Sequence, residues 1–129
     1  TDGLKLSPSL TSLYRKGLFE HLRLDIWDCL STEELLSSYS SVEIFDVHYK
    51  IDSCVMELFY QQTGLAADVL TSLDHSFIRA MIPSTIAERL YGTDARYYIY
   101  NNSFDPLARE AIAIAQNQER IEEILRGER

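Results

Sequence analysis

Two histidine–aspartate pairs are the residues of this sequence best suited to chemistry. His48 and Asp52 are four residues apart, and His21 and Asp25 repeat that spacing. Residues four apart on a helix share a face, so each carboxylate could orient the neighbouring imidazole as carboxylates do beside general bases and metal ligands. Each pair therefore raises the question of a catalytic or metal-binding role.

A structural explanation of the His48–Asp52 pair competes with the catalytic one. A helix from about Ser41 to Gln62 would place both residues within or beside an apolar stripe that contains Ile44, Val47, Ile51, Cys54, Val55, Leu58 and Phe59. A partly buried imidazole and carboxylate need partners, and these two are each other's nearest candidates. We favour this pairing, because catalysis also needs a nucleophile or an oxyanion site and no spacing indicates either. We predict no catalytic residues.

The second pair gives a weak indication of a metal site. A divalent-metal site in a helical bundle needs several inward-facing carboxylates. His21, Asp25 and Asp28 instead fall on the side of their helix that faces away from the expected core, so a solvated surface is the simpler interpretation. The sequence also contains no glycine-rich phosphate loop, CxxC pair or HExxH motif. We predict neither a metal nor a cofactor.

Helix-capping signals recur along the chain and predict an all-α fold. Capping boxes begin at Ser31, Ser40 and Thr85, and glycines stand where helices should end. The signals predict three longer helices, at residues 8–30, 41–62 and 106–126, and several short ones, at 32–38, 65–73, 74–82 and 85–91. We expect an irregular helical bundle that forms a single domain over residues 1–129.

Two local features interrupt this helical pattern. The apolar stripe of the first helix changes face near Gly17, so we expect a bend or a change of packing partner there. The segment Arg96–Tyr100 is rich in strand-favouring aromatic residues but has no second strand to pair with. We interpret that segment as a bent helix or an extended linker.

The composition is that of a globular protein, with 46% hydrophobic and 25% charged residues. No apolar run approaches the length of a membrane span, and the first residues have no signal-peptide core. Because the sequence starts with Thr1, we expect a domain excised from a longer chain or a processed one. Cys29 and Cys54 lie among apolar residues and could pair, but a domain of this size does not need a disulfide. We therefore predict reduced, buried thiols in an intracellular protein, cytoplasmic or nuclear.

The net charge of −8 is concentrated in the middle of the chain. Residues 20–74 carry eleven acidic side chains against two basic ones, Arg23 and Lys50. A negative field repels phosphate backbones, so we predict no nucleic-acid binding. The same field would attract a protein partner with a basic segment, although a need for solubility alone explains the acidity equally well.

Apolar and aromatic residues outside the core-facing stripes are the candidate partner-binding residues. Tyrosine and arginine commonly anchor interfaces, although the same residues could plug the end of the bundle. In the last helix a glutamine interrupts an apolar stripe and two isoleucines lie outside it, so a homodimer through residues 106–126 is one expectation. The candidates are Trp27, Tyr91, Arg96, Tyr97, Tyr98, Tyr100, Ile112, Gln118 and Ile124.

From these features we predict a non-catalytic helical interaction domain, an adaptor or regulator. It would bind a protein partner through apolar and Tyr/Arg-bearing helix surface. The alternative is a small helical enzyme or ligand-binding protein with a pocket near His48 and Asp52. Whether His48 opens into a cavity distinguishes the two.

Overall fold

The described part of the chain is mainly helical, with short linkers between the helices. The computed structural model describes residues 6–103 and five further positions, 113, 114, 117, 121 and 125. The all-α class predicted from the sequence is confirmed, since no strand occurs among these residues. None of their helices combines the length and apolarity needed to cross a membrane. The elements are α1 (Pro8–Arg15), α2 (Leu18–Asp25), η2 (Ile26–Asp28), α3 (Thr32–Ser38), α4 (Val42–His48), α5 (Ser53–Thr63), η3 (Ala67–Val69), α6 (Ser72–Tyr91) and α7 (Thr93–Ser103).

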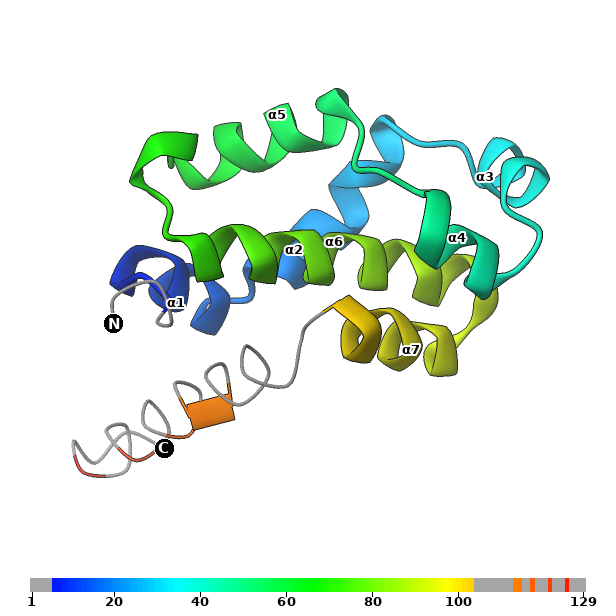
Figure 1. The fold of residues 1–129 in the computed structure, drawn as a ribbon. Helices are drawn as coiled ribbons and strands as arrows, with labels where there is room; N and C mark the ends of the chain where they lie inside the picture. The colour runs from blue at the N-terminus through cyan, green and yellow to red at the C-terminus, as the bar shows by residue number, and fades with distance from the viewer. Residues whose placement is uncertain (1–5, 104–112, 115–116, 118–120, 122–124, 126–129) are drawn as a thin grey trace.

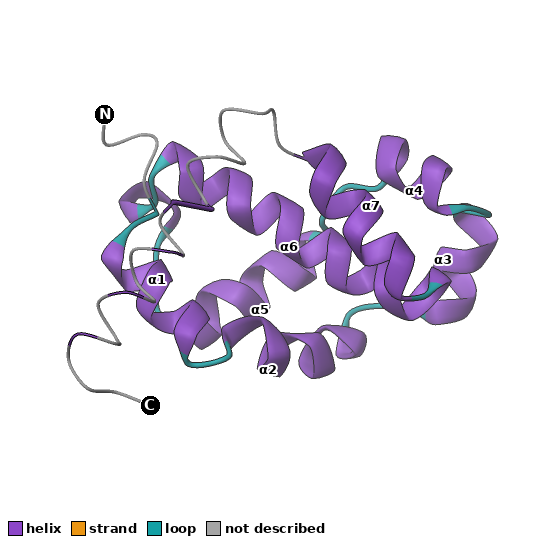
Figure 2. Cartoon of the chain, turned by 90° about the horizontal axis from the view of Figure 1, so that it is seen from below, coloured by secondary structure: helices purple, strands orange, loops and turns teal. Residues whose placement is uncertain are grey.

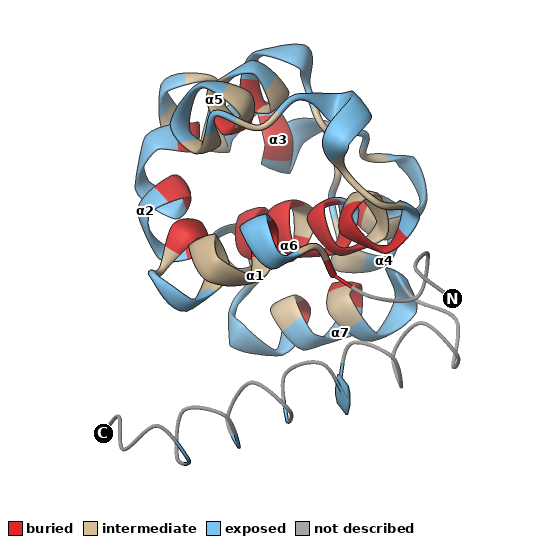
Figure 3. Ribbon diagram, turned by 90° about the vertical axis from the view of Figure 1, so that its left-hand side faces the viewer, coloured by how far each residue is buried: buried red, intermediate tan, exposed pale blue. Residues whose placement is uncertain are grey.

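The helix α6 forms the centre of the fold, with α5 along one side and α7 along the other (Figures 1 and 3). Eleven of its twenty residues are buried, so apolar side chains face several directions. A helix buried on several sides has no single apolar stripe. This burial explains why the sequence pattern did not predict one long helix in this region.

The predicted division of α6 at Pro83 is wrong. The helix continues through Pro83, and Thr85, which was predicted to cap a separate helix, lies in its interior. Proline removes one backbone hydrogen bond, which normally disfavours a helix interior. Here the hydroxyl groups of Ser84 and Thr85 donate to carbonyl oxygens one turn earlier, and both side chains are buried. Packing on several sides of α6 outweighs the local cost of the proline.

A buried carboxylate fixes the start of α6 to the start of α1. The Thr71 hydroxyl accepts the Asp74 N–H at 3.0 Å, and the Asp74 carboxylate accepts the Thr71 N–H at 2.9 Å, which completes a capping box. The N-cap is therefore Thr71, and α6 begins two residues before the short helix predicted over 74–82. The other oxygen of Asp74 accepts the N–H of Ser7, the N-cap of α1, at 2.8 Å. Asp74 is fully buried and joins two helices that are distant in sequence.

Two of the predicted longer helices are broken. The bend expected near Gly17 is confirmed, because this residue adopts φ 85°, which favours glycine, and separates α1 from α2. The continuous helix predicted over 41–62 is wrong, since α4 ends at His48 and α5 begins at Ser53. The break lets α4 lie against α6 and α7 while α5 runs along another side of α6, and one straight helix could not reach both places (Figure 1).

The aromatic segment Arg96–Tyr100 lies inside the regular helix α7, so the extended alternative is wrong. Ala95 and Ile99 are four residues apart and buried, and they form the face that packs on α6. Figure 2 shows α7 beside α6. Burial of these two residues outweighs the strand preference of the surrounding tyrosines.

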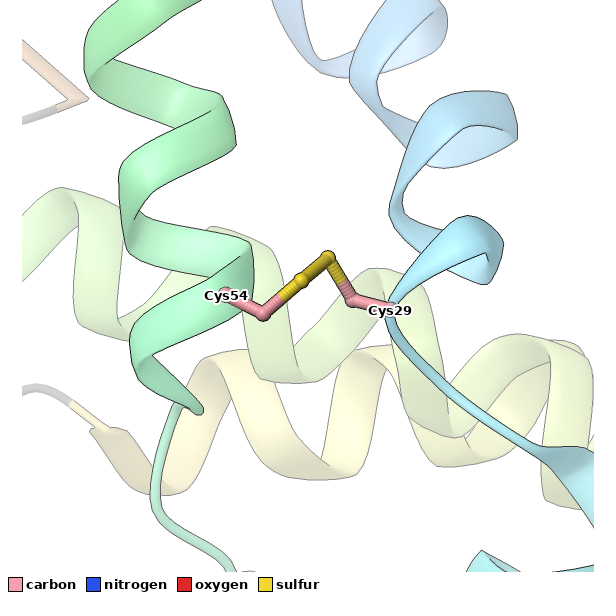
Figure 4. Close-up of a disulfide and its surroundings, with 2 residues drawn as sticks. All are labelled: Cys29 and Cys54. Carbon is pink, nitrogen blue, oxygen red and sulfur yellow. A yellow bond between two sulfur atoms is a disulfide. The ribbon is translucent and has the colours of Figure 1, made fainter.

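The predicted reduced thiols are also wrong, because Cys29 and Cys54 form a disulfide (Figure 4). The bond links the residue after η2 to the first turn of α5. The prediction assumed a continuous helix that buries Cys54, but the break before α5 leaves Cys54 exposed and facing Cys29. The intracellular prediction rested on reduced thiols and loses that support.

Candidate functional site

The structure separates the two members of the His48–Asp52 pair. His48 ends α4, Asp52 is the N-cap of α5, and both side chains are exposed. No hydrogen bond or ion pair joins them in the region that the structure describes. The pairing predicted from helical spacing is wrong, because residues Tyr49–Ile51 between them are not helical.

Of the His21–Asp25 pair, Asp25 contributes to the packing of α5. The Asp25 carboxylate accepts a hydrogen bond from the Gln62 side chain at 2.6 Å, which ties the end of α2 to the end of α5. His21 lies exposed on α2. Among residues 6–103 and the five isolated positions, no three His, Cys, Asp or Glu side chains gather where they could hold a metal ion.

Two adjacent tyrosines form the most accessible aromatic surface in the described ranges. Tyr97 is 58% exposed and Tyr98 is 37% exposed. Because α7 buries Ala95 and Ile99 against α6, Tyr97 lies on the opposite side of the helix. Asp94 is one helical turn before both tyrosines and is also exposed. We call the surface formed by Asp94, Tyr97 and Tyr98 the tyrosine face.

The neighbouring helix α4 extends this surface. Asn102 of α7 donates a hydrogen bond to the Asp46 carboxylate at 3.4 Å, which places the two helices side by side. Val47, next in sequence, is 73% exposed. Glu43 lies one turn before Asp46 and is exposed as well. The tyrosine face therefore borders a second surface that carries one apolar side chain and two carboxylates.

Two other predicted partner-binding residues contribute to the packing of the fold. Trp27 is half-buried, the Arg89 guanidinium lies 4.6 Å from its ring centroid, and its ring N–H is buried with no acceptor among the described residues. The Tyr91 hydroxyl donates to the Tyr39 carbonyl oxygen. Burial raises the pKa of Tyr91, with a smaller contribution from Tyr39.

Arg96 and Tyr100 lie on the flanks of α7. The Arg96 guanidinium pairs with Glu88 at 3.7 Å. Tyr100 packs partly against the core, and burial raises its pKa, with Tyr14 adding to the effect. Of the five predicted residues between Tyr91 and Tyr100, Tyr97 and Tyr98 offer the freest ring surface.

Three predicted residues, Ile112, Gln118 and Ile124, lie outside the described residues, as does most of the helix predicted over 106–126. The described members of that segment's apolar stripe are helical. All of them are exposed, namely Ile114, Ile121 and Leu125.

A cavity opens between α5, α6 and the linker that joins α4 to α5, near the place where the alternative interpretation expected a pocket. Its volume of about 510 Å³ lies in the range of small-molecule sites. Neither His48 nor Asp52 lines it, although the linker between them does. The residues that line the cavity could not be predicted, because the cavity forms only where the predicted helix is broken. The lining residues are Tyr49, Lys50, Ile51, Met56, Tyr60, His75, Ile78, Arg79 and Pro83.

Tyr49 joins this cavity to the aromatic cluster behind it. Its ring stacks on Phe45 at 4.5 Å and meets Tyr39 edge-on at 5.9 Å. Its hydroxyl oxygen is buried and has no hydrogen-bond partner of good geometry in the part of the chain described. Burial, and secondly the negative charge of Asp52, raise the pKa of Tyr49 well above its usual range.

No protein-family model, curated protein or solved structure matches this chain. The function therefore has to be argued from the geometry of the chain itself.

Proposed function

We propose that this chain is a non-catalytic protein-interaction domain, acting as an adaptor or regulator, and that the tyrosine face binds its partner. The observation that carries the proposal is the exposure of two adjacent rings, Tyr97 and Tyr98, on a helix whose other side is anchored to α6. Tyrosine supplies rigid contact area with a polar tip and loses little conformational entropy on binding. A rigid helix also holds both rings in place before binding.

The charges around the tyrosine face favour a partner with a basic segment. Asp94 lies within the face, and Glu43 and Asp46 border it on α4. The nearest arginine along α7, Arg96, is paired with Glu88 on a different side of the helix. Carboxylates at the rim of an interface mainly steer association and select the partner.

A homodimer through the C-terminal segment is a second proposal, favoured by Ile114, Ile121 and Leu125. These residues are helical, apolar and exposed. Their spacing of seven and four residues places them on one side of a helix, where a second copy could cover them. Sedimentation equilibrium over a wide concentration range tests this proposal, and a strict monomer would contradict it.

The disulfide favours an oxidising compartment for the working protein. Disulfides persist in such compartments and are rare where thiols are kept reduced. This proposal replaces the intracellular location that was inferred from free thiols. Mass spectrometry of the alkylated protein, isolated without reductant, tests it by counting the free thiols.

The binding proposal is tested with a double variant and a matched control. Tyr97→Ser with Tyr98→Ser removes both rings of the tyrosine face, whereas Leu24→Ser removes a residue on α2 that is 68% exposed. With the natural chain as bait, affinity capture should recover a partner that the double variant loses and the Leu24→Ser variant retains. Association should also weaken as salt is added. A partner that binds the double variant as well as the natural chain would overturn the proposal, as would the absence of any partner.

A further inference from the structure

The cavity between α5 and α6 is lined by apolar side chains and by two basic ones. Met56 on α5 and Ile78 on α6 come from opposite walls, and Ile51 of the linker and Pro83 of α6 add further apolar surface. Lys50 of the linker and Arg79 of α6 supply two cationic groups to the same cavity. An apolar cavity with a few polar groups at one place is the usual form of a small-molecule site.

The charge of the lining differs from that of the chain as a whole. The protein has 20 acidic residues and a net charge of −8, yet none of the acidic residues that the structure describes lines this cavity. Lys50 is one of only two basic residues in the acidic stretch 20–74. Lys50 and Arg79 are both exposed and form no ion pair with the residues that the structure describes. Two basic side chains in a lining where the structure describes no carboxylate favour an anion, and the charge of Asp52, which acts on Tyr49 in the same lining, opposes them.

We propose that this cavity binds a small amphipathic organic anion, an aliphatic carboxylate whose head group meets Lys50 and Arg79 and whose chain lies between Met56 and Ile78. The carboxylate forms charge-assisted hydrogen bonds with the two basic side chains, and arginine can hold it in a bidentate arrangement. The chain gains affinity because it leaves water for an apolar surface.

This site is separate from the tyrosine face. The cavity lies on the α5 side of α6, whereas α7 covers another side of that helix (Figures 1 and 3). A carboxylate that binds here need not touch the protein partner. The two proposals therefore succeed or fail independently.

The first test compares three ligands in calorimetric titrations of the natural chain, namely sodium octanoate, 1-octanol and sodium acetate. Octanoate should bind at least tenfold more tightly than octanol, because only octanoate carries the charge that Lys50 and Arg79 recognise. Acetate, which has the head group without the chain, should show no measurable binding. Equal affinities for octanoate and octanol would overturn the proposal, as would the absence of octanoate binding.

The second test uses variants to ask whether Lys50 and Arg79 bind the carboxylate. Lys50→Gln and Arg79→Gln should each lower the octanoate affinity about three- to tenfold and leave octanol binding unchanged. Both side chains are exposed, so the melting temperature should not change. The controls Lys16→Gln and Arg23→Gln remove the same charge at exposed positions that do not line this cavity. Controls that weaken octanoate binding as much as the test variants would show that net charge alone matters, and would overturn the proposal.

A third variant tests the apolar body of the site. Met56→Trp places a larger side chain on the α5 wall and should abolish the binding of octanoate. Circular dichroism and thermal melting establish that the variant is folded. If it does not fold, the charge variants still decide the proposal. Undiminished octanoate binding to a folded Met56→Trp variant would place the ligand elsewhere and overturn the assignment.

Discussion

The helices α5 and α6 are held in the fold in different ways. Eleven residues of α6 are buried, including a carboxylate that hydrogen bonds to α1. Only Val55 and Phe59 are buried in α5, which is also held by the Cys29–Cys54 disulfide and by the hydrogen bond between Gln62 and Asp25. A helix fixed at its two ends and by a few side chains need not pack closely along its length. The cavity opens beside α5, and the proposed binding site exists because α5 is less closely packed than α6.

The largest loss of stability is expected from a substitution of Asp74 at the start of α6. Asp74→Ala removes the acceptor for two backbone N–H groups, those of Ser7 and Thr71, in a fully buried position. Each unsatisfied group costs roughly 1–3 kcal/mol, so the free energy of unfolding should fall by about 4 kcal/mol. Urea unfolding measures the change. Asp68→Ala on the exposed turn η3 serves as the control and should change stability by less than about 0.5 kcal/mol.

Loss of the disulfide should have the next largest effect and should act on α5. The disulfide spans a sequence separation of 25 residues, and a loop of this size corresponds to about 3 kcal/mol of stabilisation. The double variant Cys29→Ser and Cys54→Ser should lose that stability and should bind octanoate more weakly, because the α5 wall of the cavity loosens. Amide hydrogen exchange should increase in α5 more than in α6. Equal increases in the two helices would contradict the contrast between them.

Much of the fold could be predicted from the sequence, because local capping signals are strong. Ser31 caps α3 and accepts the Glu34 N–H as expected, and Gly17, Gly64 and Gly92 mark helix boundaries. The errors occur where tertiary packing outweighs a local signal. Pro83 lies inside α6, and the apolar periodicity that predicted one helix over 41–62 continues across a real break.

The candidate sites were less predictable, because they depend on contacts between distant segments. Tyr97 and Tyr98 could be selected by residue type, but only the burial of Ala95 and Ile99 shows that their rings are accessible. The cavity joins residues of the linker, α5 and α6, and Lys50 and Arg79 are 29 positions apart in the chain. Neither the break nor the disulfide that positions α5 is encoded by a local pattern.

Tyr49 and Tyr91 differ in the hydrogen bonding of their hydroxyl groups, so removal of each hydroxyl should change the stability in opposite directions. Tyr49→Phe on the linker before α5 removes a buried hydroxyl that has no hydrogen bond of good geometry with the described residues, and it should stabilise the protein by about 1 kcal/mol at neutral pH. Tyr91→Phe on α6 removes the donor to the Tyr39 carbonyl and should destabilise it by about 1 kcal/mol. Thermal melts of both variants measure the two signs. Changes of the same sign would contradict the assignment of the hydrogen bonds.

Tyr49 should also make the stability of the fold depend on pH in the alkaline range. The pKa of Tyr49 is raised in the folded state above its ordinary value of 10. The unfolded state therefore ionises first, and the stability contribution that is complete below pH 10 is lost as the pH rises toward the folded-state pKa. Tyr49→Phe should make the fall in stability above pH 10 less steep. Urea unfolding at several pH values measures the slope.

The smallest change in the free energy of unfolding is expected at His48, which the sequence marked as a candidate for chemistry. His48→Ala removes an exposed imidazole at the end of α4 that is not paired with Asp52, so the free energy of unfolding should change by less than about 0.5 kcal/mol. His75→Ala is the matched control on α6, because the ring nitrogen Nε2 of His75 lies 3.1 Å from the Ala67 carbonyl oxygen. Loss of that hydrogen bond should cost about 1 kcal/mol. If His48→Ala lowered the free energy of unfolding as much as His75→Ala, His48 and Asp52 would interact in solution. The break between α4 and α5 would then be less complete than the structure shows.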